Sequence, residues 1–460
     1  MASPLAAFLS PKCDPDLDFA RRPYDESETW PSELVFGGEI GWTTFETGPD
    51  GWTEISYPDM MQVLLRCGVI RAEDDRWDQL RSDHGWAALQ HQSVLRTSLS
   101  IPSIPGRKAT PILIDVSQGT EFALIPRDTE STTPTIRYTG DVYAYATTPS
   151  GTLETNGSTS NFARSLAMKP GGYTLLARAM YEIRMFGDPG VSKPPVIRLK
   201  VQVDVDEGKG VEVVKGTSVV PDLVDGWFMG DRLSVGLGAP AGEMEVLVTS
   251  AESNSVAVDL AGPVRILDGQ PRPVALRIKQ DGPLFWIPKT MTITFKVIIA
   301  GEKSSIKWQV QLRDVGPHST SPFKITVTSP EHPARAPPAL VSFAIAIPPK
   351  EPSPDIESPP PVILALHGAG VDIENPLWIG GMPSRPGGWA VLPTGKNEWG
   401  EDWHGGSMAD AWAARDALPG LIQRLGVTVS GEMLLIGHSN GGQGARHLAA
   451  RHPEKIVGGE

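Results

Sequence analysis

The chain has 460 residues, of which 54 are acidic and 41 basic, so its formal net charge at pH 7 is -13. A surface with this charge repels phosphate backbones, which argues against a nucleic-acid partner. No stretch of the sequence approaches the roughly 18 uninterrupted apolar residues that span a bilayer, so we also expect no membrane partner.

Length and composition predict a modular protein that is largely β. One hydrophobic core rarely serves a chain this long, and 48 Gly with 43 Pro indicate many turns. We expect an N-terminal arm over 1–35 and a mixed region over 36–206 that ends in a β-sandwich-like module. A second β-sandwich-like module should follow over 207–316, and a parallel sheet with flanking helices over 317–460.

The N-terminus contains no convincing signal peptide, because its apolar run at 4–9 is short and no Lys or Arg precedes it. The location of the protein therefore stays open, and secretion would require a different N-terminus.

Elements of the first half follow two patterns. Residues 60–65 and 77–89 have spacings that predict short amphipathic helices. Short apolar runs at 111–114 and 173–177 predict strands separated by turns. At 196–205 apolar and polar residues alternate strictly, which predicts a strand with one buried and one wet face.

The second module is predicted from a new series of strand-like runs with no exact internal repeat, so we expect a related sandwich rather than a solenoid or propeller. These runs lie at 245–248, 256–260, 274–278, 291–299 and 306–312.

After residue 322 the pattern changes to continuous apolar runs that alternate with helical or irregular segments. Such runs favour a parallel sheet covered on both faces. Strands are predicted at 323–328, 340–347, 362–366, 389–392 and 433–436, and a helix at 441–450, with the start of a further strand at 455–457.

The sequence Gly437-His438-Ser439-Asn440-Gly441 follows the last of these buried strands and opens the helix, which is the setting of a nucleophile elbow. The glycines remove side chains that would collide with the neighbouring strand and helix. Ser439 is therefore our candidate nucleophile, at a helix N-terminus that favours developing negative charge.

A tetrahedral intermediate needs at least two donors for its oxyanion. One is predicted to be the backbone N–H of Asn440, directly after the nucleophile. The second is predicted in the small-residue loop after the 362–366 strand, from Ala369 or its neighbour Gly368. We interpret His367 and His438 as residues that orient loops and not as proton carriers.

An aromatic and acidic cluster lies in the crossover that follows the 389–392 strand. Trp399, Asp402 and Trp403 are candidates for the rim of a substrate pocket. The alternative is that the two indoles pack the loop while Asp402 caps a turn. No metal-ligand spacing and no phosphate or dinucleotide fingerprint occurs, so we expect no metal and no cofactor.

On these residues, 323–460 resembles the catalytic domain of α/β-hydrolases, and specifically the prolyl-oligopeptidase-like serine peptidases, near the polyhydroxybutyrate-depolymerase and feruloyl-esterase-like enzymes. The matching segments are 362–370, 392–395 with 399–404, and 437–442. The resemblance implies acyl-enzyme chemistry on a small peptide or ester substrate, and makes 317–460 the N-terminal half of a catalytic domain.

The chain departs from that family after the elbow. In this fold the acid and the histidine follow the serine, but the 21 residues after Ser439 include no Asp, and His447 and His452 lie on or just past the elbow helix. We therefore interpret the sequence as truncated after the elbow and inactive by itself. The alternatives are a carboxylic-ester hydrolase of the same fold, or a non-enzymatic β-sandwich binding protein with a vestigial hydrolase half.

Overall fold

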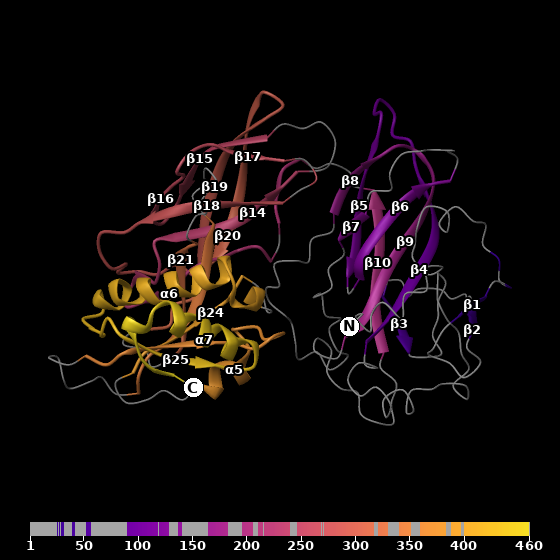
Figure 1. Cartoon of the computed structure of the whole chain (residues 1–460). Helices are drawn as coiled ribbons and strands as arrows, with labels where there is room; N and C mark the ends of the chain where they lie inside the picture. Colours follow the sequence, from indigo (N-terminus) through magenta and orange to yellow (C-terminus); the bar gives the residue numbers. More distant parts are fainter. Residues whose placement is uncertain are drawn as a thin grey trace. The chain divides into compact units, whose positions relative to one another are not determined.

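A computed structural model shows a multidomain protein that is mostly β-strand with few helices. It divides into two compact units, Met1–Gly208 with Pro240–Gly242, and Lys209–Ala239 with Glu243–Glu460 (Figure 1). The residues it describes are 25, 27, 29–31, 39–41, 52–56, 90–117, 119–127, 137–139, 164–182, 196–205, 210–214, 216–239, 246–267, 269, 271–316, 321–329, 340–350, 359–382, 388–396 and 400–459.

The first unit contains two four-stranded antiparallel sheets, ordered β3-β10-β5-β8 and β4-β9-β6-β7, and the small pair β1-β2. Their strands are β1 (Thr29–Pro31), β2 (Glu39–Gly41), β3 (Trp52–Ser56), β4 (Gln90–Ile101), β5 (Thr110–Ser117), β6 (Gly119–Pro126), β7 (Arg137–Thr139), β8 (Arg164–Met168), β9 (Gly171–Glu182) and β10 (Val196–Val205).

Three sequence predictions fall on described strands of this unit and are confirmed, because β5, β9 and β10 cover 111–114, 173–177 and 196–205. In β10, Val201 and Val203 are half-buried while Gln202 and Asp204 are exposed, so the more buried apolar residues alternate with exposed polar ones. The helices predicted at 60–65 and 77–89 and most of the 1–35 arm lie outside the described residues.

In the second unit, two four-stranded antiparallel sheets, β11-β14-β18-β16 and β17-β15-β19-β20, enclose one apolar core. Leu233 and Val235 of β14 contribute to this core together with Phe295 of β19, whose ring stacks on Trp308 of β20 at 6.4 Å. The strands are β11 (Glu212–Val213), β14 (Arg232–Gly238), β15 (Val246–Ser253), β16 (Ala257–Asp259), β17 (Val264–Ile266), β18 (Arg272–Lys279), β19 (Thr290–Ile299) and β20 (Glu302–Gln311), with the pair β12 (Leu223–Val224) and β13 (Trp227–Phe228) beside them.

The same unit contains a six-stranded sheet with the order β21-β22-β24-β23-β25-β26. Its strands are β21 (Phe323–Thr328), β22 (Val341–Ile347), β23 (Val362–Leu366), β24 (Ala390–Pro393), β25 (Met433–Gly437) and β26 (Ile456–Gly459). The pairs β24-β23, β23-β25 and β25-β26 are parallel, whereas β21 and β22 join antiparallel at one side. The predicted strands of this region are therefore confirmed, in a mixed sheet.

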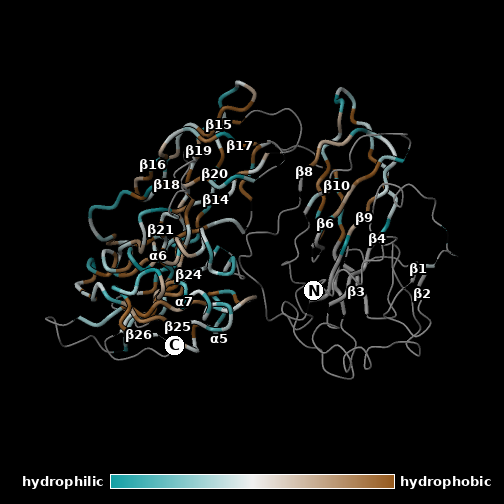
Figure 2. The backbone as a smooth tube through the Cα atoms, in the orientation of Figure 1, coloured by the Kyte–Doolittle hydropathy of each residue, from teal (hydrophilic) through white to brown (hydrophobic). Residues whose placement is uncertain are grey.

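Helices cover both faces of this sheet. The helices α6 (Gly406–Gln423) and α7 (Asn440–Arg451) pack on one face, where Leu364, Leu418 and Leu448 share a core. The short helix α5 (Pro376–Gly381) packs on the other, where Trp378 contacts a second core that includes Ile363. The 3-10 turns η4 (Gly400–Trp403) and η5 (Pro453–Lys455) precede α6 and β26. Hydrophobic stretches are visible in this region, as they are in the strands of the two-sheet part (Figure 2).

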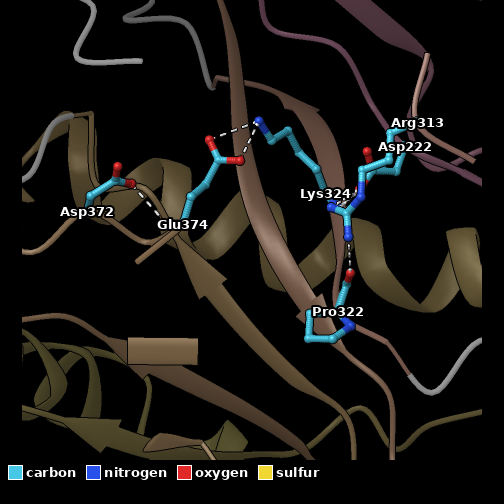
Figure 3. Close-up of polar contacts among 6 residues, drawn as sticks. All are labelled: Asp222, Arg313, Pro322, Lys324, Asp372 and Glu374. Carbon is cyan, nitrogen blue, oxygen red and sulfur yellow. Dashed lines mark hydrogen bonds and ion pairs between the residues drawn. The ribbon is translucent and has the colours of Figure 1, made fainter. Parts of the chain in front are cut away.

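Asp222 links the two-sheet part of the unit to the six-stranded sheet. Its carboxylate accepts the backbone N–H of Lys324 at 2.6 Å and an N–H of Arg313 at 3.0 Å. The ammonium of Lys324 in turn contacts both carboxylate oxygens of Glu374 at 3.0 Å (Figure 3). Burial raises the pKa of Asp222, against the hydrogen bond from Lys324 and the charge of Arg313. This chain of contacts connects β21 to the segment that precedes α5.

Candidate active site

Ser439 occupies a sharp turn between β25 and α7. Its backbone has φ 54° and ψ -115°, a conformation that non-glycine residues adopt at a cost of about 1–3 kcal/mol. The residue is exposed at the N-terminus of α7, as its prediction as a nucleophile requires. The strain is held in place by backbone bonds on both sides, from Gly441 N to His438 O at 2.8 Å and from Gly442 N to Ser439 O at 3.0 Å.

The glycines of the elbow have the steric role expected from the sequence. A Cβ atom at Gly437 would overlap the carbonyl oxygen of Gly441, and one at Gly441 would overlap the carbonyl oxygen of Leu366. Both atoms belong to backbone and have little freedom to move. No residue larger than glycine therefore fits at either position without a shift of the strand or the helix.

The loop after β23 packs directly on this elbow. A Cβ atom at Gly368 would lie 2.7 Å from His438 Nδ1 and 3.2 Å from Ser439 Cβ. The backbone N–H of His438 also donates to Leu366 O at 3.1 Å. The structure thus brings together four of the predicted site residues, Ser439, its neighbour Asn440, Gly368 and the half-buried Ala369.

His367 precedes this loop and is fully buried. Its Nδ1 lies 2.9 Å from the carbonyl oxygen of Gly368 and its Nε2 lies 3.2 Å from that of Thr394. Burial lowers the pKa of His367, while the two carbonyls and the charge of Asp372 act in the opposite direction. Both ring nitrogens face backbone oxygens, as expected of a histidine that orients the loop.

The crossover before α6 contains a left-handed turn that contacts both the elbow and the segment that leads into the loop after β23. Glu401, Asp402 and Trp403 have φ of 46°, 53° and 55°, which is unusual for three consecutive non-glycine residues. The carboxylate of Asp402 accepts a hydrogen bond from Asn440 Nδ2 at 3.1 Å. Asp402 is itself exposed.

Trp403 is fully buried and its indole faces the protein interior. The ring packs edge-on against His367 with 4.9 Å between centroids, and its Nε1–H donates to His367 O at 3.0 Å. Gly444 of α7 makes room for it, since a Cβ atom there would lie 2.6 Å from Trp403 Cβ. This side chain offers no surface to a substrate. Trp399, the third predicted rim residue, lies outside the described residues.

A second polar cluster, for which the sequence contains no recognisable pattern, lies on three segments of the same domain. The buried hydroxyl of Ser329 donates to Asp410 Oδ1 at 2.5 Å. The ammonium of Lys396 donates to Ser329 Oγ at 2.6 Å and lies 2.8 Å from Asp410 Oδ2. Asp410 is only 1% exposed. The three residues tie the loop after β24 to β21 and to α6.

The two histidines after the elbow pack elsewhere. The ring of His447 meets that of His404 at 4.8 Å, and the ring of His452 stacks on Trp412 at 4.3 Å. No hydrogen bond from a histidine to Ser439 Oγ occurs within the part of the chain that the structure describes. Over those same residues no group of three or more His, Cys, Asp or Glu is placed to hold a metal, and no helix is long and apolar enough to cross a membrane.

Comparisons with known proteins give one curated relative and several structural neighbours. No family profile matches the chain. An uncharacterized secreted protein of Arthroderma benhamiae is 24% identical over 450 residues, which cover 94% of this chain and 42% of the relative. The chain therefore spans less than half the length of the curated relative it matches.

The solved structures that resemble parts of the chain include esterases and prolyl peptidases. An S-formylglutathione hydrolase from Agrobacterium tumefaciens is 18% identical, with a TM-score of 0.22 and coverage of 31% of this chain and 57% of the other. An oligopeptidase B from Trypanosoma brucei is 12% identical, with a TM-score of 0.21 and coverage of 61% and 45%.

Proposed function

We propose that this chain carries the nucleophile and oxyanion half of a serine hydrolase of the α/β-hydrolase fold, of the prolyl-oligopeptidase type. In this proposal the two-sheet parts are β-sandwich modules that precede the catalytic domain. The observation that supports it best is the convergence of the strained Ser439 turn with the Gly368 loop, whose Cβ position is 3.2 Å from Ser439 Cβ.

The proposed chemistry is acyl transfer. Ser439 Oγ attacks the carbonyl carbon of a peptide or ester, and its proton passes to a general base as the tetrahedral intermediate forms. The N–H groups of Asn440 and Ala369 stabilise the oxyanion, and the leaving group departs with a proton to give an acyl-serine that water hydrolyses. Each oxyanion donor is worth about 10²–10³ in kcat.

The general base and its acid are proposed to come from polypeptide beyond residue 460. Histidines 447 and 452 are engaged with His404 and Trp412 instead of with Ser439. Ser439 is exposed among the residues that the structure describes, which leaves its hydroxyl open to a base from that polypeptide. We therefore propose that this chain is inactive until that part is present.

The test uses the protein encoded by the whole reading frame that contains this sequence. A fluorophosphonate probe should label it, and Ser439→Ala should abolish labelling, while the exposed Ser255→Ala serves as control. Equal labelling of the Ser439→Ala variant, or none of the parent protein, contradicts the proposal. A genuine stop codon after residue 460 contradicts it for this chain. Hydrolysis of a proline-containing peptide against a p-nitrophenyl ester then separates peptidase from esterase.

A binding role of the second β-sandwich is the other candidate function, and one observation favours it. Phe285 and Trp286 are 102% and 78% exposed on the loop between β18 and β19. The loop is held by the bond from Leu284 N to Gly226 O at 2.8 Å, so both rings project from a fixed base. If the binding role is right, Trp286→Ser should release the protein from an insoluble polysaccharide that retains the parent. Equal retention of both contradicts this role.

A further inference from the structure

The peptide unit between Gly368 and Ala369 carries the second proposed oxyanion donor. A trans peptide is planar, and its C=O and N–H point in opposite directions. Because His367 Nδ1 lies 2.9 Å from Gly368 O, the imidazole holds the carbonyl end of this unit. The N–H of Ala369 is thereby turned away from the buried ring.

The hydrogen bond from His367 to the Gly368 carbonyl requires a proton on Nδ1 of the imidazole. Both ring nitrogens of His367 face carbonyl oxygens, which only accept hydrogen bonds. A neutral ring has one N–H, so it donates to Gly368 O or to Thr394 O but not to both. The shorter contact, 2.9 Å against 3.2 Å, favours a proton on Nδ1.

A neighbouring aromatic side chain packs against the His367 ring. The indole of Trp403 packs edge-on against it and also binds the His367 carbonyl through Nε1–H. The neighbouring Asp402 accepts from the side chain of Asn440, the other proposed donor residue. One left-handed turn thus supports the two segments that carry the oxyanion donors.

We propose that His367 is a positioning residue of the oxyanion hole, in which the Nδ1–H tautomer holds the Gly368 carbonyl and so directs the Ala369 N–H at the oxyanion. This inference rests on the proposed function for its catalytic meaning. The orientation of the Gly368–Ala369 peptide is measurable without any enzymatic activity, so the positioning role of His367 and the proposed hydrolase function can fail separately.

The tautomer is tested in the unmodified chain by the ¹⁵N shifts of the histidine rings. A protonated, pyrrole-like Nδ1 at His367, assigned by loss of its signals in His367→Asn, is the expected result. A pyridine-like Nδ1 with the proton on Nε2 overturns the proposal, whatever the variants do.

Two variants then separate the two ring positions. The amide nitrogen of Asn in His367→Asn occupies roughly the place of Nδ1, and that of Gln in His367→Gln roughly the place of Nε2. The sequence has three Gly-Ala pairs, at 238–239, 368–369 and 444–445. Labelling Gly at the carbonyl carbon and Ala at nitrogen therefore reports Ala369 directly, while Ala239 and Ala445 monitor the fold of the same unit.

In His367→Asn the Ala369 amide should stay close to its position in the parent protein, and in His367→Gln it should move, with Ala239 and Ala445 unchanged in both. Equal Ala369 signals in the two variants contradict the proposal. In a catalytically active full-length protein, His367→Gln should lower kcat by about 10²–10³ with KM retained, and His367→Asn should restore most of it. Normal activity of His367→Gln with a displaced Ala369 signal also contradicts the proposal.

Discussion

The indole Nε1–H of Trp403 donates to the backbone carbonyl of His367 at 3.0 Å, and the contact is buried on both sides. It joins the crossover before α6 to the loop that follows β23. Because neither group has water to replace a lost partner, this bond should contribute measurably to stability.

Replacing Trp403 with Phe keeps most of the ring but removes its donor. The carbonyl of His367 is then left unpaired inside the protein, so the free energy of unfolding should fall by about 1–3 kcal/mol. Urea titration measures the change. Trp286→Phe, at a side chain that is 78% exposed, should stay within about 0.5 kcal/mol of the parent. Equal losses of stability in Trp403→Phe and Trp286→Phe would contradict a stabilising role of the Trp403 hydrogen bond.

Two glycines on α7 form a matched pair. A Cβ atom at Gly444 lies 2.6 Å from Trp403 Cβ, whereas one at Gly442 approaches nothing closer than 3.4 Å, at Gly437 O. Gly444→Ala should therefore destabilise the protein by about 1–3 kcal/mol through overpacking. Gly442→Ala should be neutral or stabilise by up to about 1 kcal/mol through helix propensity. Thermal unfolding compares them, and the reverse order would contradict the structure.

The ion pair of Lys396 with Asp410 should matter far more than one on the surface. Lys396→Met leaves a carboxylate that is 1% exposed without its cation, which should cost about 3–5 kcal/mol. Adding Asp410→Asn should recover a large part of that loss. Lys296→Met, which breaks an exposed 2.7 Å pair with Glu252, should cost at most about 1 kcal/mol. Chemical unfolding of the parent, Lys396→Met, Lys396→Met with Asp410→Asn, and Lys296→Met measures these changes in stability. A larger loss of stability in Lys296→Met than in Lys396→Met would contradict the prediction.

Asp222 predicts a pH dependence of stability with a definite sign. Burial raises the pKa of this carboxyl above its ordinary value of 3.8, so the folded state holds the proton more tightly than the unfolded chain. The associated stability is complete below pH 3.8 and is lost as the pH rises through the folded pKa.

Asp222→Asn does not titrate, so its stability relative to the parent protein should increase between pH 3.5 and 7 in urea unfolding. Asp372, whose pKa burial also raises, is present in both proteins and cancels. The exposed Asp281→Asn is the control. A relative stability of Asp222→Asn that falls with rising pH would contradict the sign.

The sequence predicts best those features that rest on local patterns. Strand β21 begins and ends at the predicted residues, Phe323–Thr328, and α7 extends the predicted helix by a single residue at each end. Hydrophobic periodicity and glycine spacing determine these elements, and both are visible within ten or so residues.

Features that depend on distant contacts are the ones missed. Ser329 and Asp410 are 81 positions apart, and no pattern near either residue indicates their hydrogen bond. The left-handed run from Glu401 to Trp403 is equally hidden, because acidic and aromatic residues rarely adopt positive φ without tertiary support. The 12-residue strand β4 escapes because its sequence is polar for most of its length.

Val224 and Met229 come from the segment around the β12-β13 pair, yet both are fully buried in the core that the six-stranded sheet shares with α6. A recombination breakpoint near residue 317 would separate these two side chains from the helix and strands that enclose them. The module before that point should therefore be inherited together with the sheet, and shuffling experiments that exchange the sheet should retain residues 209–316 of the same parent.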